Sequence, residues 1–315
     1  MKIIFFGTPV FAIPSFEALH FSDHEIVSVV TIKDKKQGRG MISKASPIKK
    51  YANALGYEII EAEEFNDKNF ISRLRSYNAD LFIVIAFKLL PKSVFSIPRF
   101  GTFNLHASLL PNYRGADPIR HALLNNDSIT GVTAFQIEED IDTGPIILYK
   151  KCNINKNDNY DSLSRKLSNL SSVVLIEMVE NFETLYSSKA IQDQSNDSKS
   201  KASKINIAES FIDWGHNDGQ YIINKMRAFT PKPGLKTFYN GKRLIFKKIE
   251  HILIEHSNLS PGAIEKIEDR IFVGTISGSI EISEIQFDNK KQINANSFWN
   301  GYCASTNKRY FTTDA

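Results

Sequence analysis

The chain has 315 residues and a formal net charge of +4, with 42% hydrophobic and 23% charged residues. This size and composition are typical of a soluble protein with two domains, and no apolar run is long enough to cross a membrane. The two cysteines lie far apart in the sequence, which excludes a disulfide framework and a cysteine-based metal cluster. We therefore expect a cytoplasmic protein without a metal.

The first part of the chain alternates between strand-like and helix-like segments. Strands are expected over 2–7, 25–32, 57–63, 80–87, 101–108, 131–139 and 144–152, and helices over 10–21, 46–56, 66–79, 116–127 and 161–186. The stretch 33–47 has no apolar period and is predicted to be a long basic loop. This alternation indicates an α/β domain with a Rossmann-like, mostly parallel sheet that helices cover on both faces. Ligands bind at the carboxyl ends of the strands in such sheets.

The second part of the chain has a different pattern. Residues 189–208 are polar and rich in serine, so we predict a linker there, between a domain at 1–188 and another at 209–315. The second domain is expected to begin with a helix over 212–229. Short strands follow at 235–239, 242–249, 261–267, 270–276 and 278–287, and Asn240-Gly241 predicts a hairpin between the first two. This pattern indicates a small open β-barrel, similar to an OB fold.

The excess of positive charge lies in the second domain. From residue 201 onward there are sixteen Lys and Arg against twelve Asp and Glu, so the first 200 residues are neutral. Eight basic residues and no acid lie between Lys225 and Lys248, and seven basic residues and one acid lie between Lys33 and Lys50. Such stretches are either solvated faces or contacts for a polyanion.

The candidate catalytic residues are Asn104, His106 and Asp142. On a strand, Asn104 and His106 point to the same face, where their N–H groups can stabilise an oxyanion. Asp142 precedes a Thr-Gly-Pro turn and is a carboxylate that can orient the imidazole. Because no Ser or Cys stands out as a nucleophile, the group indicates direct acyl transfer between two amines. The alternative for His106 is a hydrogen-bonded core residue.

Two other classes of site are disfavoured by the sequence. The turn after the first strand, FFGTPVFA, contains a single glycine, and neither G-x-G-x-x-G nor a P-loop occurs in the chain. The pyrophosphate of a dinucleotide would have no close-approach loop, so we do not expect a site for NAD or ATP.

The run NLHASLLPNYRGADPI, followed by TGVTAFQIEEDIDTGP, resembles the formyltransferases that use 10-formyltetrahydrofolate. Over the whole chain, with IDW, MRAFTPKPG and SFWNGY in the second domain, the resemblance is to the methionyl-tRNA formyltransferase family. It implies formyl transfer from 10-formyltetrahydrofolate to the amine of initiator methionyl-tRNA, with Asn104, His106 and Asp142 as the catalytic trio.

The resemblance also implies two sets of binding residues. The set expected to bind folate is Phe87, Lys88, Leu89, Leu90, Ser108, Leu109, Leu110, Pro111, Glu138 and Asp140. The set expected to contact tRNA is Lys35, Lys36, Arg39, Lys44, Lys225, Arg227, Lys232, Lys242 and Lys247.

Two alternative functions stay open at this point. One is a folate-dependent formyltransferase that acts on an amino sugar nucleotide, but such a substrate gives no reason for the two basic stretches. The other is a non-catalytic RNA-binding protein on a degenerate enzyme fold, against which the intact trio argues. No heptads or large apolar stripes stand out in the sequence, so we expect a monomer.

Overall fold

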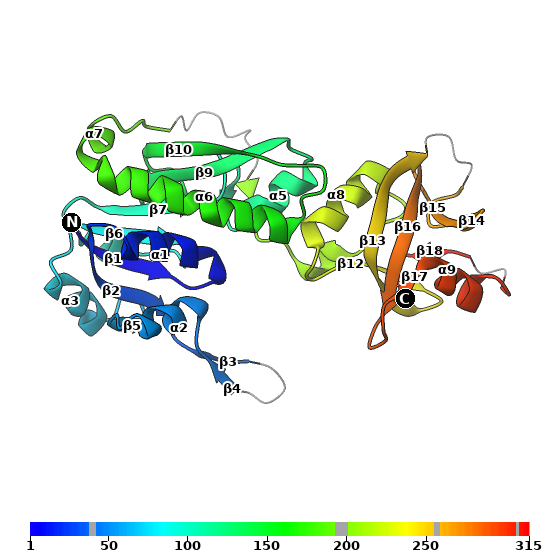
Figure 1. Cartoon of the computed structure of the whole chain (residues 1–315), viewed down its shortest axis with the longest axis horizontal. Helices are drawn as coiled ribbons and strands as arrows, with labels where there is room; N and C mark the ends of the chain where they lie inside the picture. The colour runs from blue at the N-terminus through cyan, green and yellow to red at the C-terminus, as the bar shows by residue number, and fades with distance from the viewer. Residues whose placement is uncertain (38–41, 193–200, 255–258, 307–308, 315) are drawn as a thin grey trace. The chain divides into compact units, whose positions relative to one another are not determined.

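The structure is a computed structural model that describes residues 1–37, 42–192, 201–254, 259–306 and 309–314 (Figure 1). It divides into two compact units. The first contains 1–118, 128–154 and 163–203, and the second contains 119–127, 155–162 and 204–315. None of the helices in the described part of the chain is long and apolar enough to span a membrane.

A seven-stranded sheet organises the first unit, with the order β10-β9-β7-β6-β1-β2-β5 (Figure 1). Five of its strands are parallel: β1 (Lys2–Gly7), β2 (Glu25–Ile32), β5 (Ile59–Ala62), β6 (Leu81–Ile85) and β7 (Thr102–His106). The other two, β9 (Ile129–Gln136) and β10 (Ile146–Asn153), are antiparallel to their neighbours. The prediction of a mostly parallel sheet is therefore confirmed.

Helices cover both faces of this sheet. They are α1 (Ile13–His20), α2 (Pro47–Ala54), α3 (Lys68–Ser76), α4 (Lys92–Phe95), α6 (Tyr160–Glu180) and α7 (Phe182–Ser187), with the short helix η1 (Val10–Ala12) before α1. Successive side chains of β1 point to opposite faces of the sheet. Phe5 packs on Phe16 of α1, with ring centroids 5.2 Å apart, whereas Phe6 joins the cluster that contains Phe70 and Leu74 of α3.

Two expectations for the first unit were wrong in detail. The stretch predicted as a basic loop contains a hairpin, in which β3 (Lys35–Gln37) pairs with β4 (Ile42–Lys44). The two strands form hydrogen bonds with each other. They therefore lack the regular spacing of apolar residues by which a buried strand is recognised in a sequence. The helix predicted over 161–186 is interrupted at Asn181, whose side chain donates to the carbonyl of Glu177 at 3.0 Å. Such local side-chain bonds compete with the helical ladder.

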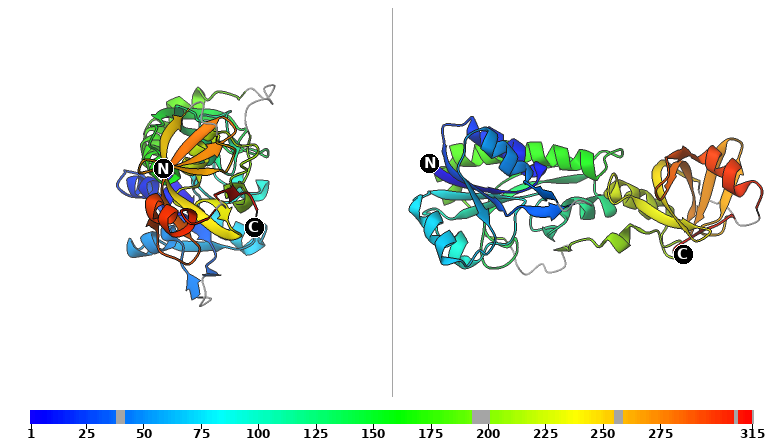
Figure 2. Two further views of the ribbon diagram at one scale, coloured as in Figure 1. Left: turned by 90° about the vertical axis from the view of Figure 1, so that its right-hand side faces the viewer. Right: turned by 90° about the horizontal axis from the view of Figure 1, so that it is seen from below.

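The second unit is an antiparallel barrel. Its strands are β12 (Leu235–Tyr239), β13 (Lys242–Ile254), β14 (Ile264–Ile267), β15 (Arg270–Thr275), β16 (Gly278–Phe287), β17 (Ile293–Asn294) and β18 (Phe311–Thr312). The order β14-β15-β16-β13-β12-β18 closes because Ile264 N–H donates to the carbonyl of Arg309 and Phe311 N–H to that of Gly262, both at 2.8 Å. Figure 2 shows these curved strands from two further sides.

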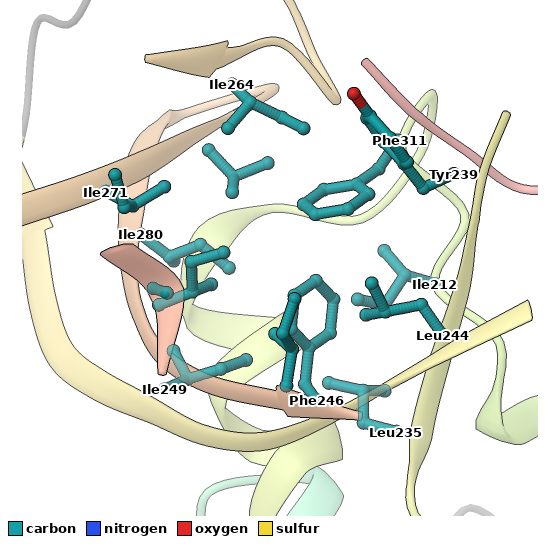
Figure 3. Packing of buried hydrophobic residues seen from close by; sticks show 14 of the residues in the cluster. Ile212, Leu235, Tyr239, Leu244, Phe246, Ile249, Ile264, Ile271, Ile280 and Phe311 are labelled. Atoms are coloured by element: carbon teal, nitrogen blue, oxygen red, sulfur yellow. The ribbon is translucent and has the colours of Figure 1, made fainter. Parts of the chain in front are cut away.

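Apolar side chains from all sides of the barrel fill its centre (Figure 3). Leu235, Leu244, Phe246, Ile280 and Phe311 are among its buried members. The helices of this unit are α5 (Pro118–Leu124), α8 (Gly219–Phe229) and α9 (Ala295–Phe298), with the short helices η2 (Ile207–Ser210) and η3 (Trp299–Cys303).

Two predictions for the second unit have opposite outcomes. The Asn240-Gly241 hairpin is confirmed, since both residues have positive φ, 48° and 69°, as a type I′ turn requires. The helix predicted from residue 212 begins only at Gly219. Asp218 caps it by accepting from the N–H of Tyr221 at 2.6 Å, and Ile212 N–H instead donates to the carbonyl of Lys236.

Candidate active site

Asn104 and His106 lie on the same face of β7, because the strand contains both and they are two residues apart. His106 is the last residue of the strand and is 6% exposed. Asn104 is half-buried, and within the described residues no other group makes a hydrogen bond to its side-chain amide. Asn104 therefore offers two N–H donors that are available to a ligand.

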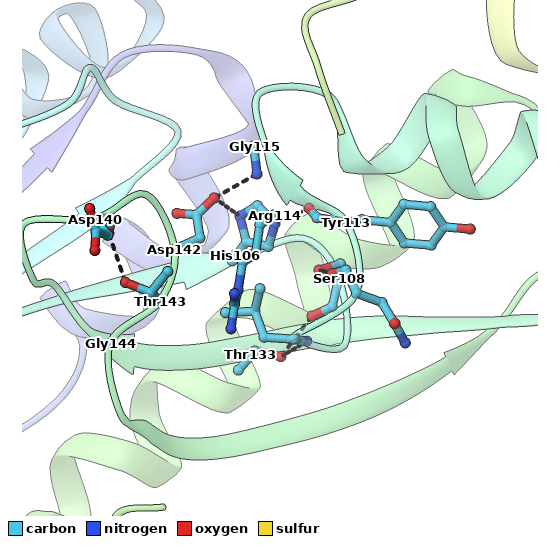
Figure 4. Close-up of polar contacts among 12 residues, drawn as sticks. His106, Ser108, Tyr113, Arg114, Gly115, Thr133, Asp140, Asp142, Thr143 and Gly144 are labelled. Carbon is cyan, nitrogen blue, oxygen red and sulfur yellow. Dashed lines mark hydrogen bonds and ion pairs between the residues drawn. The ribbon is translucent and has the colours of Figure 1, made fainter. Parts of the chain in front are cut away.

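Asp142 reaches the imidazole from the turn after β9 (Figure 4). Its Oδ2 lies 3.6 Å from Nδ1 of His106 and accepts the backbone N–H of Gly115 at 2.8 Å. The other ring nitrogen, Nε2, donates to the carbonyl of Tyr113 at 2.8 Å. A carbonyl only accepts, so Nε2 carries a hydrogen, and Nδ1 can donate toward the carboxylate only when the ring is an imidazolium.

The turn that presents Asp142 depends on its own residue types. Asp142 has φ +54°, a left-handed conformation that Asp and Asn adopt more readily than other side chains. A Cβ on Gly144 would lie 1.8 Å from the carbonyl oxygen of Gln136. The close approach of this turn to β9 therefore requires glycine, which explains the Thr-Gly-Pro sequence after Asp142.

The turn after β7 is held from inside by two buried hydroxyls. Thr133, on β9, donates its Oγ1 hydrogen to the carbonyl of Ser108 at 2.7 Å and accepts the N–H of Leu110 at 3.1 Å. The hydroxyl of Ser108 donates to the carbonyl of Asn112 at 2.7 Å. Ser108 was expected to contact folate, but its side chain is fully buried and supports the turn.

The other residues expected to bind folate, in this turn and in the loop after β9, differ in their exposure. Leu109 and Pro111 are half-buried and Leu110 is 8% exposed. Glu138 and Asp140 are exposed, and the carbonyl of Asp140 accepts the hydroxyl of Thr143 at 3.1 Å.

The loop after β6 combines core and surface residues. Phe87 packs on Phe6, with ring centroids 5.6 Å apart, and Leu90 is buried. Lys88 is exposed, and so is 69% of Leu89. An open pocket of about 530 Å³ lies beside this loop and is lined by Glu64, Phe65, Asn66, Leu89, Leu90 and Pro91. Of the two leucines in this lining, Leu90 belongs to the core and Leu89 to the surface.

Lys225 and Arg227 were expected to contact tRNA, and the structure corrects this. Both are buried in α8, 6% and 7% exposed. Lys225 Nζ donates to the carbonyl of Phe211 at 2.6 Å, and burial lowers its pKa to about 8. Arg227 donates to the carbonyls of Asp158 and Asn155 at 2.8 and 3.1 Å. A side chain enclosed in this way cannot reach a phosphate, so both residues support the second unit.

The other residues expected at tRNA have different positions. Lys44, Lys232, Lys242 and Lys247 are exposed. Lys35 and Lys36 lie on β3, and Arg39 lies outside the described residues. Two neighbouring cations are paired with acids: Arg243 with Asp288, which is distant in sequence, and Lys248 with Glu250, on the same strand. The positive charge near β13 is therefore lower than the sequence indicates.

Four residues of the site were missed by the sequence analysis. Tyr113 and Gly115 act through backbone groups and belong to the NYRG run, which was noticed only as a motif. Thr133 is one of three polar residues in β9, with Thr130 and Gln136, so its residue type alone did not distinguish it. Gln192 lies within the predicted linker, yet it is 5% exposed and bonds to the turn after Asp142; no local pattern marks it.

Metal ligands are not grouped in the described part of the chain, where no three His, Cys, Asp or Glu side chains are placed to hold an ion.

Comparisons with known proteins agree on the class of enzyme. The formyl transferase family model matches residues 1–179, and its C-terminal domain model matches 204–303. The chain is 40% identical to the methionyl-tRNA formyltransferase of Thermodesulfovibrio yellowstonii over 95% of both chains. It is 36% identical to that of Flavobacterium johnsoniae over 99% of both.

A solved structure shares the fold at lower identity. A sugar 3N-formyl transferase, solved in the presence of dTDP and 5-N-formyl-THF, is 22% identical, with a TM-score of 0.65, and the match covers 92% of this chain and 99% of that one. At this identity the likeness supports the fold and carries nothing about the substrate.

Proposed function

This chain belongs to the methionyl-tRNA formyltransferase family, and from that membership we propose that it transfers the formyl group of 10-formyltetrahydrofolate to the α-amine of initiator methionyl-tRNA. The observation that carries the proposal is the meeting of Asn104, His106 and Asp142, from two separate segments, at the carboxyl end of β7. These groups can stabilise charge and move a proton, and no covalent intermediate is needed.

The amine is the nucleophile in this reaction. An α-amino group has a pKa of about 8, so a substantial fraction of the methionyl ester is neutral near pH 7 and can attack the formyl carbon. Negative charge then develops on the formyl oxygen. Asn104 donates to this oxygen, because its amide N–H groups have no partner among the described residues. His106 joins it when Nε2–H exchanges the carbonyl of Tyr113 for the formyl oxygen.

Two protons must move for the transfer to finish. The attacking nitrogen loses one, and N10 of the folate gains one as the carbon–nitrogen bond to it breaks. Asp142 is the nearest described base to the imidazole, at 3.6 Å, and we propose that Asp142 and His106, with a bound water, carry this proton.

The folate lies, in this proposal, against the loops that follow β6, β7 and β9, whose residues include Leu89, Leu109 and Asp140. The tRNA lies against the exposed lysines Lys44, Lys232, Lys242 and Lys247, together with Lys35, Lys36 and Arg39. We further propose that the enzyme works as a monomer in the cytoplasm, where initiator tRNA is charged.

One assay separates this function from the amino sugar alternative. The purified protein is incubated with 10-formyltetrahydrofolate and either charged initiator tRNA or a dTDP-linked amino sugar, and the formylated product is identified by mass spectrometry. We expect formyl-methionine after hydrolysis of the tRNA ester and no formylated sugar. Formyl transfer to the sugar alone would overturn the proposal.

A further inference from the structure

The side chain of Gln192 connects two segments of the active site. Its Nε2 donates to the carbonyls of Asp142 and Gly144, at 3.1 and 2.7 Å. Its Oε1 accepts from Nη2 and Nε of Arg114, at 2.7 and 3.3 Å. Gln192 is 5% exposed, so both ends of a buried amide are used, and such bonds are costly to leave unmade.

One end of Gln192 holds the turn that carries the carboxylate. Asp142 has a left-handed backbone, and Gly144 is pressed against the carbonyl of Gln136. The two Nε2 bonds fix the carbonyls on either side of Thr143. The direction of the Asp142 side chain depends on these backbone positions.

The other end of Gln192 holds the segment that carries the partners of the trio. Arg114 lies between Tyr113, whose carbonyl accepts from His106, and Gly115, whose N–H donates to Asp142. Arg114 and Gly115 form the short strand β8, which pairs with β11 (Lys201–Ala202). Gly115 has φ +124°, and a Cβ there would lie 2.5 Å from the carbonyl oxygen of Ala202. The segment is therefore held by Gln192 on one side and by β11 on the other.

We infer that Gln192 is a positioning residue that sets the distance and angle between Asp142 and the His106 ring. Its side chain bonds both to the turn of Asp142 and to Arg114, which lies between Tyr113 and Gly115. The inference rests on the proposed function only for its catalytic consequence. The geometric part holds for any reaction at this site.

The test uses Gln192→Glu in the full-length protein. Glutamate keeps the length and the acceptors for Arg114 but places a carboxylate oxygen against the carbonyls of Asp142 and Gly144. We expect kcat to fall by about 10²-fold, the loss typical of a small misplacement of catalytic groups. We expect the KM values for both substrates to change much less, and the pH profile of kcat to shift.

The matched control is Lys189→Met. Lys189 lies on the same segment and donates to Oε1 of Gln136 at 2.8 Å, while its neighbour Ala190 pairs with Ile146 of β10. This variant loosens the segment without removing a bond to Asp142, so we expect kcat and its pH profile to stay near those of the wild type.

A second readout does not depend on the substrate. In protein labelled with ¹⁵N-histidine, the His106 resonances, assigned with His106→Gln, report the hydrogen bonding of the two ring nitrogens. We expect these ring resonances, recorded at one fixed pH, to move in Gln192→Glu and in Gln192→Met and not in Lys189→Met. If the wild type transfers no formyl group to methionyl-tRNA, the proposed function fails while the NMR comparison still decides the positioning role.

The outcomes are separable. Unchanged His106 resonances in Gln192→Glu, or equal changes in Gln192→Glu and Lys189→Met, would overturn the inference. If Gln192→Glu does not fold, Gln192→Met, which keeps the volume and removes all four bonds, takes its place with the same expected results. Loss of the fold in both variants would also overturn it, since Gln192 would then be a structural support only.

Discussion

Nδ1 of His106 and Oδ2 of Asp142 are 3.6 Å apart, and the carboxylate is fixed by the N–H of Gly115 and not by the ring. This distance is longer than a hydrogen bond, and while Nε2 donates to the carbonyl of Tyr113 the neutral ring has no hydrogen on Nδ1 to donate to the carboxylate. The pair therefore forms its strongest contact when the ring takes up a second proton and becomes an imidazolium.

The first prediction follows from this pair. Asp142→Asn keeps the size of the side chain and an acceptor for Gly115, but it removes the charge beside His106. We expect kcat to fall by about 10²–10⁴-fold, the range for loss of a general acid–base group, with little change in thermal stability. Single-turnover formylation measures the rate, and a variant within a few-fold of the wild type would remove Asp142 from the trio.

Asn104 gives a second prediction. Asn104→Ala removes the two amide donors that, in the proposed reaction, bind the formyl oxygen, and loss of one such donor costs about 10²–10³-fold in rate. We expect this loss in kcat with similar KM values, because the charge on the oxygen develops only in the transition state. Asn53→Ala, at an exposed position on α2, is the control and should keep full activity. Equal kcat values for the two variants would contradict the assignment.

The third prediction concerns the turn after Asp142. In Gly144→Ala the new Cβ would meet the carbonyl oxygen of Gln136 at 1.8 Å, so the turn must move. We expect a loss of about 1–3 kcal/mol in the free energy of unfolding together with loss of activity. Gly301→Ala is the matched control, because no atom lies within 4 Å of its added Cβ. A stable and active Gly144→Ala would show that the turn tolerates displacement.

Local patterns in the sequence predicted most elements of the first unit. A helix was predicted over 46–56; Ser46, at its start, accepts the N–H of Lys49 at 3.1 Å, and Gly56, at its end, has φ +79°. These signals need only neighbouring residues, as do the alternation along β7 and the Asn240-Gly241 turn. The strand that brings Asn104 and His106 to one face was therefore accessible from sequence.

Features that depend on distant contacts were not accessible in the same way. Gln192 lies in a polar segment without a period, and its importance comes from carbonyls about fifty residues earlier in the chain, which no local rule connects to it. Lys225 and Arg227 were interpreted as surface cations. The sequence does not reveal that α8 is enclosed on several sides, where backbone carbonyls take the place of water.

The burial of Lys225 leads to a prediction about pH. Its pKa is lowered to about 8 in the folded protein, against about 10.4 in an unfolded chain. The unfolded chain binds more protons between these pH values, so the contribution of this group to the free energy of unfolding rises with pH. The destabilising effect of the buried charge is fully present below pH 8 and fades toward pH 10.4.

Lys225→Met removes this contribution and is measured by urea unfolding at several pH values from 7 to 10. We expect the stability of the wild type to increase relative to the variant as the pH rises above 8. Lys232→Met, at an exposed lysine of the same unit, should keep the pH dependence of the wild type. If the free energy of unfolding changed with pH in the same way in the wild type and in Lys225→Met, the lowered pKa of Lys225 would be refuted.

The last prediction separates surface lysines from buried ones in tRNA binding. A lysine that contacts a phosphate releases a counterion, so its removal lowers affinity and reduces the slope of log K against log salt by about 1. We expect this for Lys242→Met and Lys247→Met, which are exposed. Lys68→Met, at an exposed lysine of α3 outside both basic stretches, should keep the slope of the wild type.

Lys225→Met serves here as a buried control from the same unit as Lys242. Filter binding of initiator methionyl-tRNA from 50 to 200 mM salt measures all four variants, a range over which several phosphate contacts change the affinity strongly. An unchanged slope in Lys242→Met and Lys247→Met would move the tRNA contact away from β13. A reduced slope in Lys225→Met would mean that α8 opens when tRNA binds, since the ammonium of Lys225 is enclosed in the free protein.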